Sequence, residues 1–210
     1  MNLNIEKLGW LVAAGMGAFL IASGFDTPTT KVGVVNVATV ISKSDMETRS
    51  TATMQAAYDK RKSLIEFVNN YPVLTREQAN RFKDLSLKPT LTSAETTELA
   101  KIQTDVKAQD TKYRALQQKQ NPTNQDKADL DDYGKRVQAL GQLLGEWRDS
   151  FTEELNGQQE KSQQAIRDAA RVAIQDIGKN QGFSLILSAD VAPYGQLDTT
   201  ADVIKAINKK

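Results

Sequence analysis

The side chains that could do acid–base or metal chemistry in this sequence are mainly carboxylates, because it contains no Cys and no His. This excludes thiolate and imidazole ligands, disulfides and every catalytic dyad that needs Cys or His. Adjacent acids occur at Asp131–Asp132 and at Glu153–Glu154. Neighbouring side chains on a helix point about 100° apart, so neither pair can converge on one substrate atom. We interpret both pairs as parts of a solvated helix face.

Metal, nucleotide and nucleic-acid sites are also not predicted. Asp126, Asp129 and Asp131 have a spacing similar to that of a calcium loop, but the glycine turn and the bidentate glutamate of an EF-hand are missing. No glycine-rich phosphate-binding loop occurs in the sequence. The net charge of +1 gives no nucleic-acid footprint. We therefore expect no enzyme activity, no cofactor, no metal and no nucleic-acid partner.

The stretch that organises the chain is an unbroken heptad pattern from residue 130 to residue 151. Its apolar residues alternate at spacings of three and four, as at the a and d positions of a coiled coil. They are Leu130, Tyr133, Val137, Leu140, Leu144, Trp147 and Phe151. A second run in the same phase extends from Leu99 to Leu116. These residues indicate the seam of a helical arm, and the alternative is a surface that contacts a bound protein.

The helices are predicted to form a long antiparallel hairpin over residues 46–178, with its tip near residue 121. Pro122 cannot continue a helix, and Thr123 with Asp126 forms a capping box that starts a new one. Pairing the two sides of the hairpin would bring Thr92 beside Phe151. The ascending side is longer than the descending side, so its surplus residues, 71–91, must leave the hairpin axis. Gly178 and Asn180 are expected to end the descending helix.

Two more capping boxes, Thr75–Gln78 and Thr92–Glu95, predict helix starts on the ascending side of the hairpin. The first opens a shorter helix that carries Phe82 and Leu85 and ends before Pro89.

Short β-rich segments flank the hairpin. We expect one strand near residues 32–37, a second over 182–188, and a short third over 191–194 at an edge because Pro193 has no N–H to donate. A final helix covers about 199–208. A lone strand cannot satisfy its backbone, so the segments 31–45 and 179–210 should meet at the hairpin base as a β body. Three short strands cannot enclose a core, which favours pooling of strands between subunits.

The first thirty residues are predicted to be an export signal with a linker. Leu8 to Ala22 are all apolar or Gly, and a polar spacer follows at Asp26 to Thr30. This segment is either a cleaved signal peptide or an uncleaved anchor in the inner membrane through residues 8–25. Either alternative puts the rest of the chain outside the cytoplasm.

The two ends of the mature part resemble one known family. Residues 31–41 (KVGVVNVATVI) are similar to the first strand of the Skp/OmpH family of periplasmic chaperones. Residues 182–194 and 198–205 are similar to the closing strands and the last helix of the same family. The resemblance implies a mostly α, α+β fold in which a coiled-coil arm stands on a small β body, assembled as a jellyfish-like homotrimer. The family's trimer body maps onto Val32, Val34, Val35, Val37, Leu185, Ile186, Leu187 and Tyr194.

The resemblance also implies a function: an ATP-independent periplasmic holdase that binds unfolded outer-membrane proteins in a cavity between the arms. The charge of the predicted arm differs from that of the family. Residues 92–178 carry 12 Lys and Arg but 15 Asp and Glu, whereas the best-known relative is strongly basic. We therefore transfer no lipopolysaccharide-binding or charge-steering site. The alternative function is a membrane-tethered coiled-coil spacer or adaptor of the cell envelope.

Overall fold

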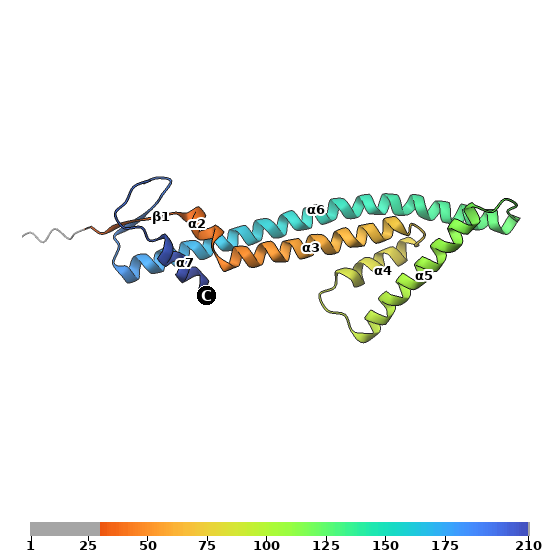
Figure 1. The fold of residues 1–210 in the computed structure, drawn as a ribbon, viewed down its shortest axis with the longest axis horizontal. Helices are drawn as coiled ribbons and strands as arrows, with labels where there is room; N and C mark the ends of the chain where they lie inside the picture. The colour runs from red at the N-terminus through yellow and green to blue at the C-terminus, as the bar shows by residue number, and fades with distance from the viewer. Residues whose placement is uncertain (1–29, 210) are drawn as a thin grey trace, which may run out of the picture.

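The computed structural model describes residues 30–209, and it shows a small body at one end of a long helical arm (Figure 1). Its elements are, in order, β1 (Val32–Val35), α2 (Val37–Ser42), α3 (Asp45–Asn70), α4 (Arg76–Leu87), α5 (Ser93–Gln117), α6 (Asn124–Gln181), β2 (Leu185–Ser188) and α7 (Thr200–Asn208). This mostly helical α+β architecture confirms the predicted fold class of the chain. The predicted export signal lies outside the described residues, except for Thr30 at its end.

The predicted capping boxes start three helices of the arm. Thr75, Thr92 and Thr123 each accept a hydrogen bond from the N–H three residues later, and the side chain at that later position accepts from the N–H of the threonine. Each box satisfies two backbone donors that a helix start leaves unpaired. These side chains therefore explain why α4, α5 and α6 begin where they do.

Charge strengthens the cap at the tip. The Lys119 ammonium, followed by the N–H and hydroxyl of Thr123, lowers the pKa of Asp126 to about 2. A lowered pKa favours the folded state above the ordinary carboxyl value of about 4, and this contribution fades as the pH falls towards 2. The cap that begins α6 is therefore fully charged at neutral pH.

The chain does not form a simple two-helix hairpin. After α3 has run along α6, the chain reverses at residues 71–75, α4 runs back, and α5 then rises to the tip, so that α4 and α5 project from one side of the arm (Figure 1). The reversal buries aromatic surface, since the rings of Phe67 and Phe82 lie 4.6 Å apart. The expected contact between Thr92 and Phe151 is therefore wrong: Arg61 of α3 covers the Phe151 ring, at 5.3 Å.

The body contains a parallel sheet of β1 and β2, in which Val32 pairs with Leu185 and Val35 with Ser188. On the other edge of β1, Val34 donates its N–H to the Leu197 carbonyl and accepts from the N–H of Thr199, both at 2.8 Å. The predicted third strand is wrong, because residues 191–194 form no strand. The chain turns there, directly after β2, with the N–H groups at 191 and 192 both bonded to the Ser188 carbonyl.

Two predicted boundaries are also wrong. Val37 does not continue the first strand but begins α2, because the Asn36 side chain accepts from the Thr39 N–H and caps a helix. Helix α6 passes through Gly178 and ends at Gly182, whose positive φ of 69° is the left-handed conformation that favours glycine.

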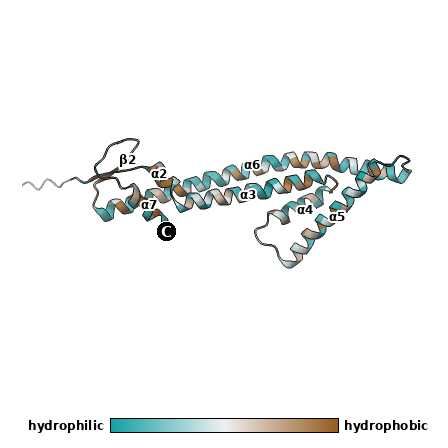
Figure 2. Ribbon diagram, in the orientation of Figure 1, coloured by the Kyte–Doolittle hydropathy of each residue, from teal (hydrophilic) through white to brown (hydrophobic). Residues whose placement is uncertain are grey.

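Two separate apolar clusters hold the molecule together. The arm cluster lies where α3, α4, α5 and α6 meet, and the body cluster joins β1, α2, α7 and the end of α6. Figure 2 shows hydrophobic segments in α2 and α7 and again towards the end of α3. The intervening part of the arm depends on the packing of two helices only.

Glycine 195 packs where no side chain fits, because a Cβ there would lie 2.5 Å from Cγ1 of Val34. We expect Gly195→Ala to lower the free energy of unfolding by about 1–3 kcal/mol, as overpacking does elsewhere. Urea denaturation followed by circular dichroism would measure the change. Gly141→Ala is the matched control: nothing lies within 4 Å of its Cβ position, and alanine should stabilise this helix by about 0.5–1 kcal/mol. The same effect from both substitutions would contradict the packing argument.

Candidate functional site

The predicted seam residues lie inside the arm. Tyr133, Leu140, Leu144, Trp147 and Phe151 are buried, and Leu130 and Val137 are half-buried. Trp147 and Phe151 keep only 4% and 6% of their surface exposed. In this structure they stabilise the arm, and they offer little surface to a bound protein. Leu143, off the heptad positions, is also buried, because more than one helix packs on α6 here.

Cations cover the aromatic rings of the seam, among them those of Trp147 and Phe151. Lys83 of α4 lies 5.4 Å from the centre of the Trp147 ring, and Arg61 of α3 lies over Phe151. Arg61 also forms an ion pair with Glu154 at 2.9 Å. Cations over aromatic faces are favourable and shield the rings from water. Side chains of both α3 and α4 therefore cover this part of the seam.

The junction between α3 and α4 is held by two arginines from the rest of the arm. Arg114 of α5 donates to the Asn70 carbonyl at the end of α3, while its Nε binds the buried carboxylate of Asp110 at 2.6 Å. Arg136 of α6 donates to the Val73 carbonyl at 3.4 Å. Both arginines satisfy carbonyls that no helix satisfies at the chain reversal. The reversal is therefore an ordered joint.

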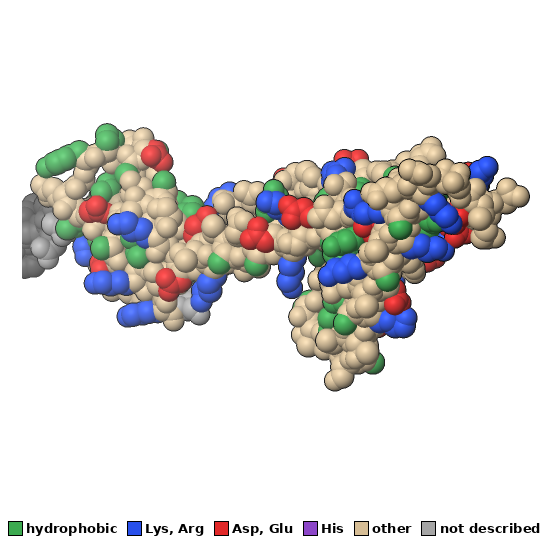
Figure 3. Space-filling view, turned by 45° about the vertical axis from the view of Figure 1, so that its right-hand side comes forward, with side chains coloured by type: hydrophobic (Ala, Val, Ile, Leu, Met, Phe, Trp, Pro, Cys, Tyr) green, Lys and Arg blue, Asp and Glu red, His purple; other side chains and the backbone are tan. Residues whose placement is uncertain are grey.

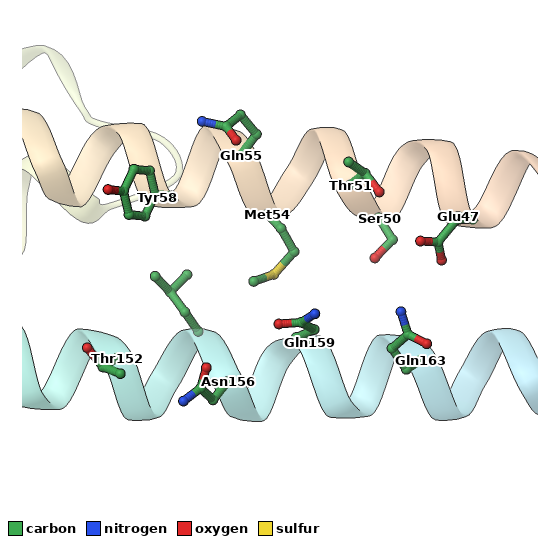
Figure 4. Close-up of a pocket in the computed structure, with 11 residues that line it drawn as sticks. Glu47, Ser50, Thr51, Met54, Gln55, Tyr58, Thr152, Asn156, Gln159 and Gln163 are labelled. Atoms are coloured by element: carbon green, nitrogen blue, oxygen red, sulfur yellow. The ribbon is translucent and has the colours of Figure 1, made fainter. Parts of the chain in front are cut away.

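Towards the body, the arm opens between α3 and α6. A polar cleft of about 470 Å³ lies there, and Figure 4 shows Met54 of α3 and Gln159 of α6 pointing into it from opposite sides. Ser50, which lines the cleft, has its hydroxyl 2.5 Å from that of Ser162. This part of the arm pairs through polar groups instead of an apolar seam.

The predicted strand residues occupy both faces of the small sheet. Val35 and Ile186 face the body cluster, whereas Val32, Val34, Leu185 and Leu187 lie on the opposite face, as the two-residue period of strands requires. Val37, as noted, belongs to α2.

The outer face of the sheet is partly covered: the segment at Gly195 packs on Val34, whereas Val32 and Leu185 stay exposed. Exposed apolar side chains gather on and beside it, and we call this set the body patch: Val32, Leu185, Val191, Tyr194 and Leu197. Tyr194 is 85% exposed, and a groove of about 340 Å³ runs beside it. Figure 3 shows hydrophobic side chains on the body. Clustered exposed apolar groups of this kind mark interaction sites.

The acid pair Asp131–Asp132 forms surface ion pairs, and in the pair Glu153–Glu154 the second residue binds Arg61. Asp131 binds Lys135 and Asp132 binds Arg136, each across one helical turn. Within residues 30–209, no group of three or more acidic side chains could hold a metal ion.

The described chain is similar to a known protein family along almost its whole length. In that part of the chain, no helix combines the length and the apolar character that a membrane span requires. Comparison with curated proteins gives no match. One family model, described as "Outer membrane protein (OmpH-like)", matches residues 31–207, which run from just before β1 almost to the end of α7. The predicted resemblance is thereby confirmed, and the chain belongs to the OmpH-like family.

Proposed function

We propose that this protein is an ATP-independent holdase chaperone of the periplasm, which binds unfolded outer-membrane proteins and prevents their aggregation. The observation that carries the proposal is a long arm on a small body that exposes clustered apolar side chains, in a chain of the OmpH-like family. Membership of this family supports a role as an envelope chaperone of outer-membrane proteins, without catalysis. The finer mechanism rests on three steps.

The first step is assembly. A two-stranded sheet leaves the body patch exposed to water, and association of copies would bury it. In a homotrimer joined through this patch, three arms would extend from one body and enclose a space. Unfolded clients would bind within that space.

The second step is passive binding. The sequence has no phosphate-binding loop, so binding and release of a client must proceed without ATP. A client that must later fold is better held by many weak contacts than by one rigid pocket. Shallow clefts along a long arm supply such contacts.

The third step is location. The apolar segment before the body supports export to the periplasm, where outer-membrane proteins pass unfolded. If residues 8–25 stay in the inner membrane, a tethered coiled-coil spacer or adaptor becomes the competing function.

The chaperone can be tested by diluting an outer-membrane protein from urea and recording light scattering. With one trimer per client and no ATP, we expect scattering to be suppressed. An unrelated coiled-coil protein at the same concentration is the control. If scattering is the same with both proteins, the spacer becomes the better explanation.

A further inference from the structure

A second cleft in the arm combines apolar and basic side chains. It lies between α3 and α6, has a volume of about 440 Å³ and is lined by Tyr58, Arg61, Ile65, Arg148, Phe151 and Leu155. We call it the basic groove. It shares Tyr58, Thr152 and Leu155 with the polar cleft of Figure 4, so the two form one track along the arm. An elongated track suits a stretch of polypeptide better than a compact small molecule.

The opposite side of the same helix pair is filled by the chain itself. There α4 packs Phe82 on Phe67 and forms an ion pair between Arg76 and Glu146 at 2.6 Å. Arg148, in the groove, is about 100° around α6 from Trp147, which α4 covers through Lys83. Helix α4 thus shows what this helix pair accepts: an amphipathic segment with an aromatic anchor and an ion pair at its edge.

The side chains that line the basic groove determine which kind of ligand it can bind. Its floor is apolar, and Tyr58 leaves half of its surface exposed above it. Three cations line it, Arg61, Lys62 and Arg148. Arg61 is already paired with Glu154, and Lys62 lies 3.9 Å from Glu66, so Arg148 is the cation best placed to meet a carboxylate of a ligand. The groove therefore complements an apolar group that carries a negative charge beside it.

We propose that the basic groove binds segments of unfolded clients in which aromatic or aliphatic side chains adjoin carboxylates. The proposal rests on the holdase function, and it identifies one client surface of the arm and the segments that this surface prefers. The apolar side chains of the client would lie on Tyr58, Ile65 and Leu155, and its carboxylates would face Lys62 and Arg148. The arm as a whole has no excess of positive charge, so this preference is local.

The test uses a short fluorescent peptide in which Phe and Leu alternate with Glu, and a second peptide with Lys in place of Glu. Fluorescence anisotropy with the full chain should show tighter binding of the Glu peptide. Arg148→Glu should weaken that binding about five- to tenfold. The matched control is Lys161→Glu, the same charge change about 20 Å further along α6, and it should change binding less than about twofold.

Tyr58→Ser provides a second variant at an exposed position and should weaken binding of the Glu peptide without a change of charge. Circular dichroism would verify that each variant is folded. Equal losses with Arg148→Glu and Lys161→Glu, or tighter binding of the Lys peptide, would overturn the proposal. Anionic phospholipid vesicles provide a further test. If they displace the peptide, and if their own binding is lost in Arg148→Glu, the groove binds a lipid surface and the proposal is overturned.

Light scattering separates the two proposals. If the wild-type protein binds the peptide through Arg148 but does not suppress aggregation, the holdase function is rejected and the groove remains a peptide-binding site. If the variants no longer bind the peptide but suppress aggregation as fully as the wild type, the groove is not a client-binding site and the holdase function stands.

Discussion

Trp147→Ala is expected to lower the free energy of unfolding by about 3–5 kcal/mol, because it removes the largest side chain of the arm cluster and leaves a cavity. Trp147 is 4% exposed and contacts Phe151, with ring centres 6.3 Å apart, as well as Lys83 of α4. The loss therefore affects both a contact within α6 and the contact between α6 and α4. Urea denaturation monitored by far-ultraviolet circular dichroism would measure it, at one protein concentration because oligomers unfold in a concentration-dependent way.

The control for this substitution is Val172→Ala on the same helix. Val172 is 43% exposed, so its truncation should cost less than about 1 kcal/mol. If Trp147→Ala were as mild as Val172→Ala, the seam would not be what stabilises the arm. The surface-contact alternative for the heptad residues would then regain support.

Sedimentation of the exported chain should give about three times the mass of one chain, if the body patch joins three copies as we propose. Val32→Asp should shift the protein to the monomer mass, because burying a carboxylate in an apolar interface costs several kcal/mol. Val32 is 41% exposed on the outer face of β1, so the monomer should tolerate the charge. The change is threefold in mass.

Tyr58→Asp is the matched control for assembly, since Tyr58 is 52% exposed on the arm and distant from the body. It should leave the mass unchanged. A wild-type monomer with a native circular dichroism spectrum would contradict the trimer outright, and dissociation by both variants would show that the patch is not the specific contact.

Local signals predicted much of the fold. The capping boxes at Thr75, Thr92 and Thr123 are complete within four residues, so the helix starts followed from the sequence. The heptad pattern marked side chains that the structure buries, because a seam of fixed period can face only one way on a helix. These successes concern interactions between residues that are close in sequence.

Some of what the sequence did not predict depends on interactions between distant residues. The direction of α4 depends on the contact between Phe67 and Phe82, and no nearby residue encodes it. The partner of the outer edge of β1 is the segment at Leu197 to Thr199, which has no strand pattern of its own. The basic groove was missed for the same reason: Arg61 and Arg148 are ordinary surface cations until α3 and α6 are side by side.

The sheet joins the two ends of the described chain, and this has a consequence for biogenesis. Lys31 and Gln181, which share a hydrogen bond beside the sheet, are 150 positions apart, and β2 follows only after all of α6. A chain that emerges N-terminus first exposes β1 long before either of its neighbours exists, whereas the arm helices can close on one another earlier. A truncated chain would thus possess an arm but no body. Completion of the chain would then be the checkpoint for the assembly that we propose, and it would keep unfinished copies out of that oligomer.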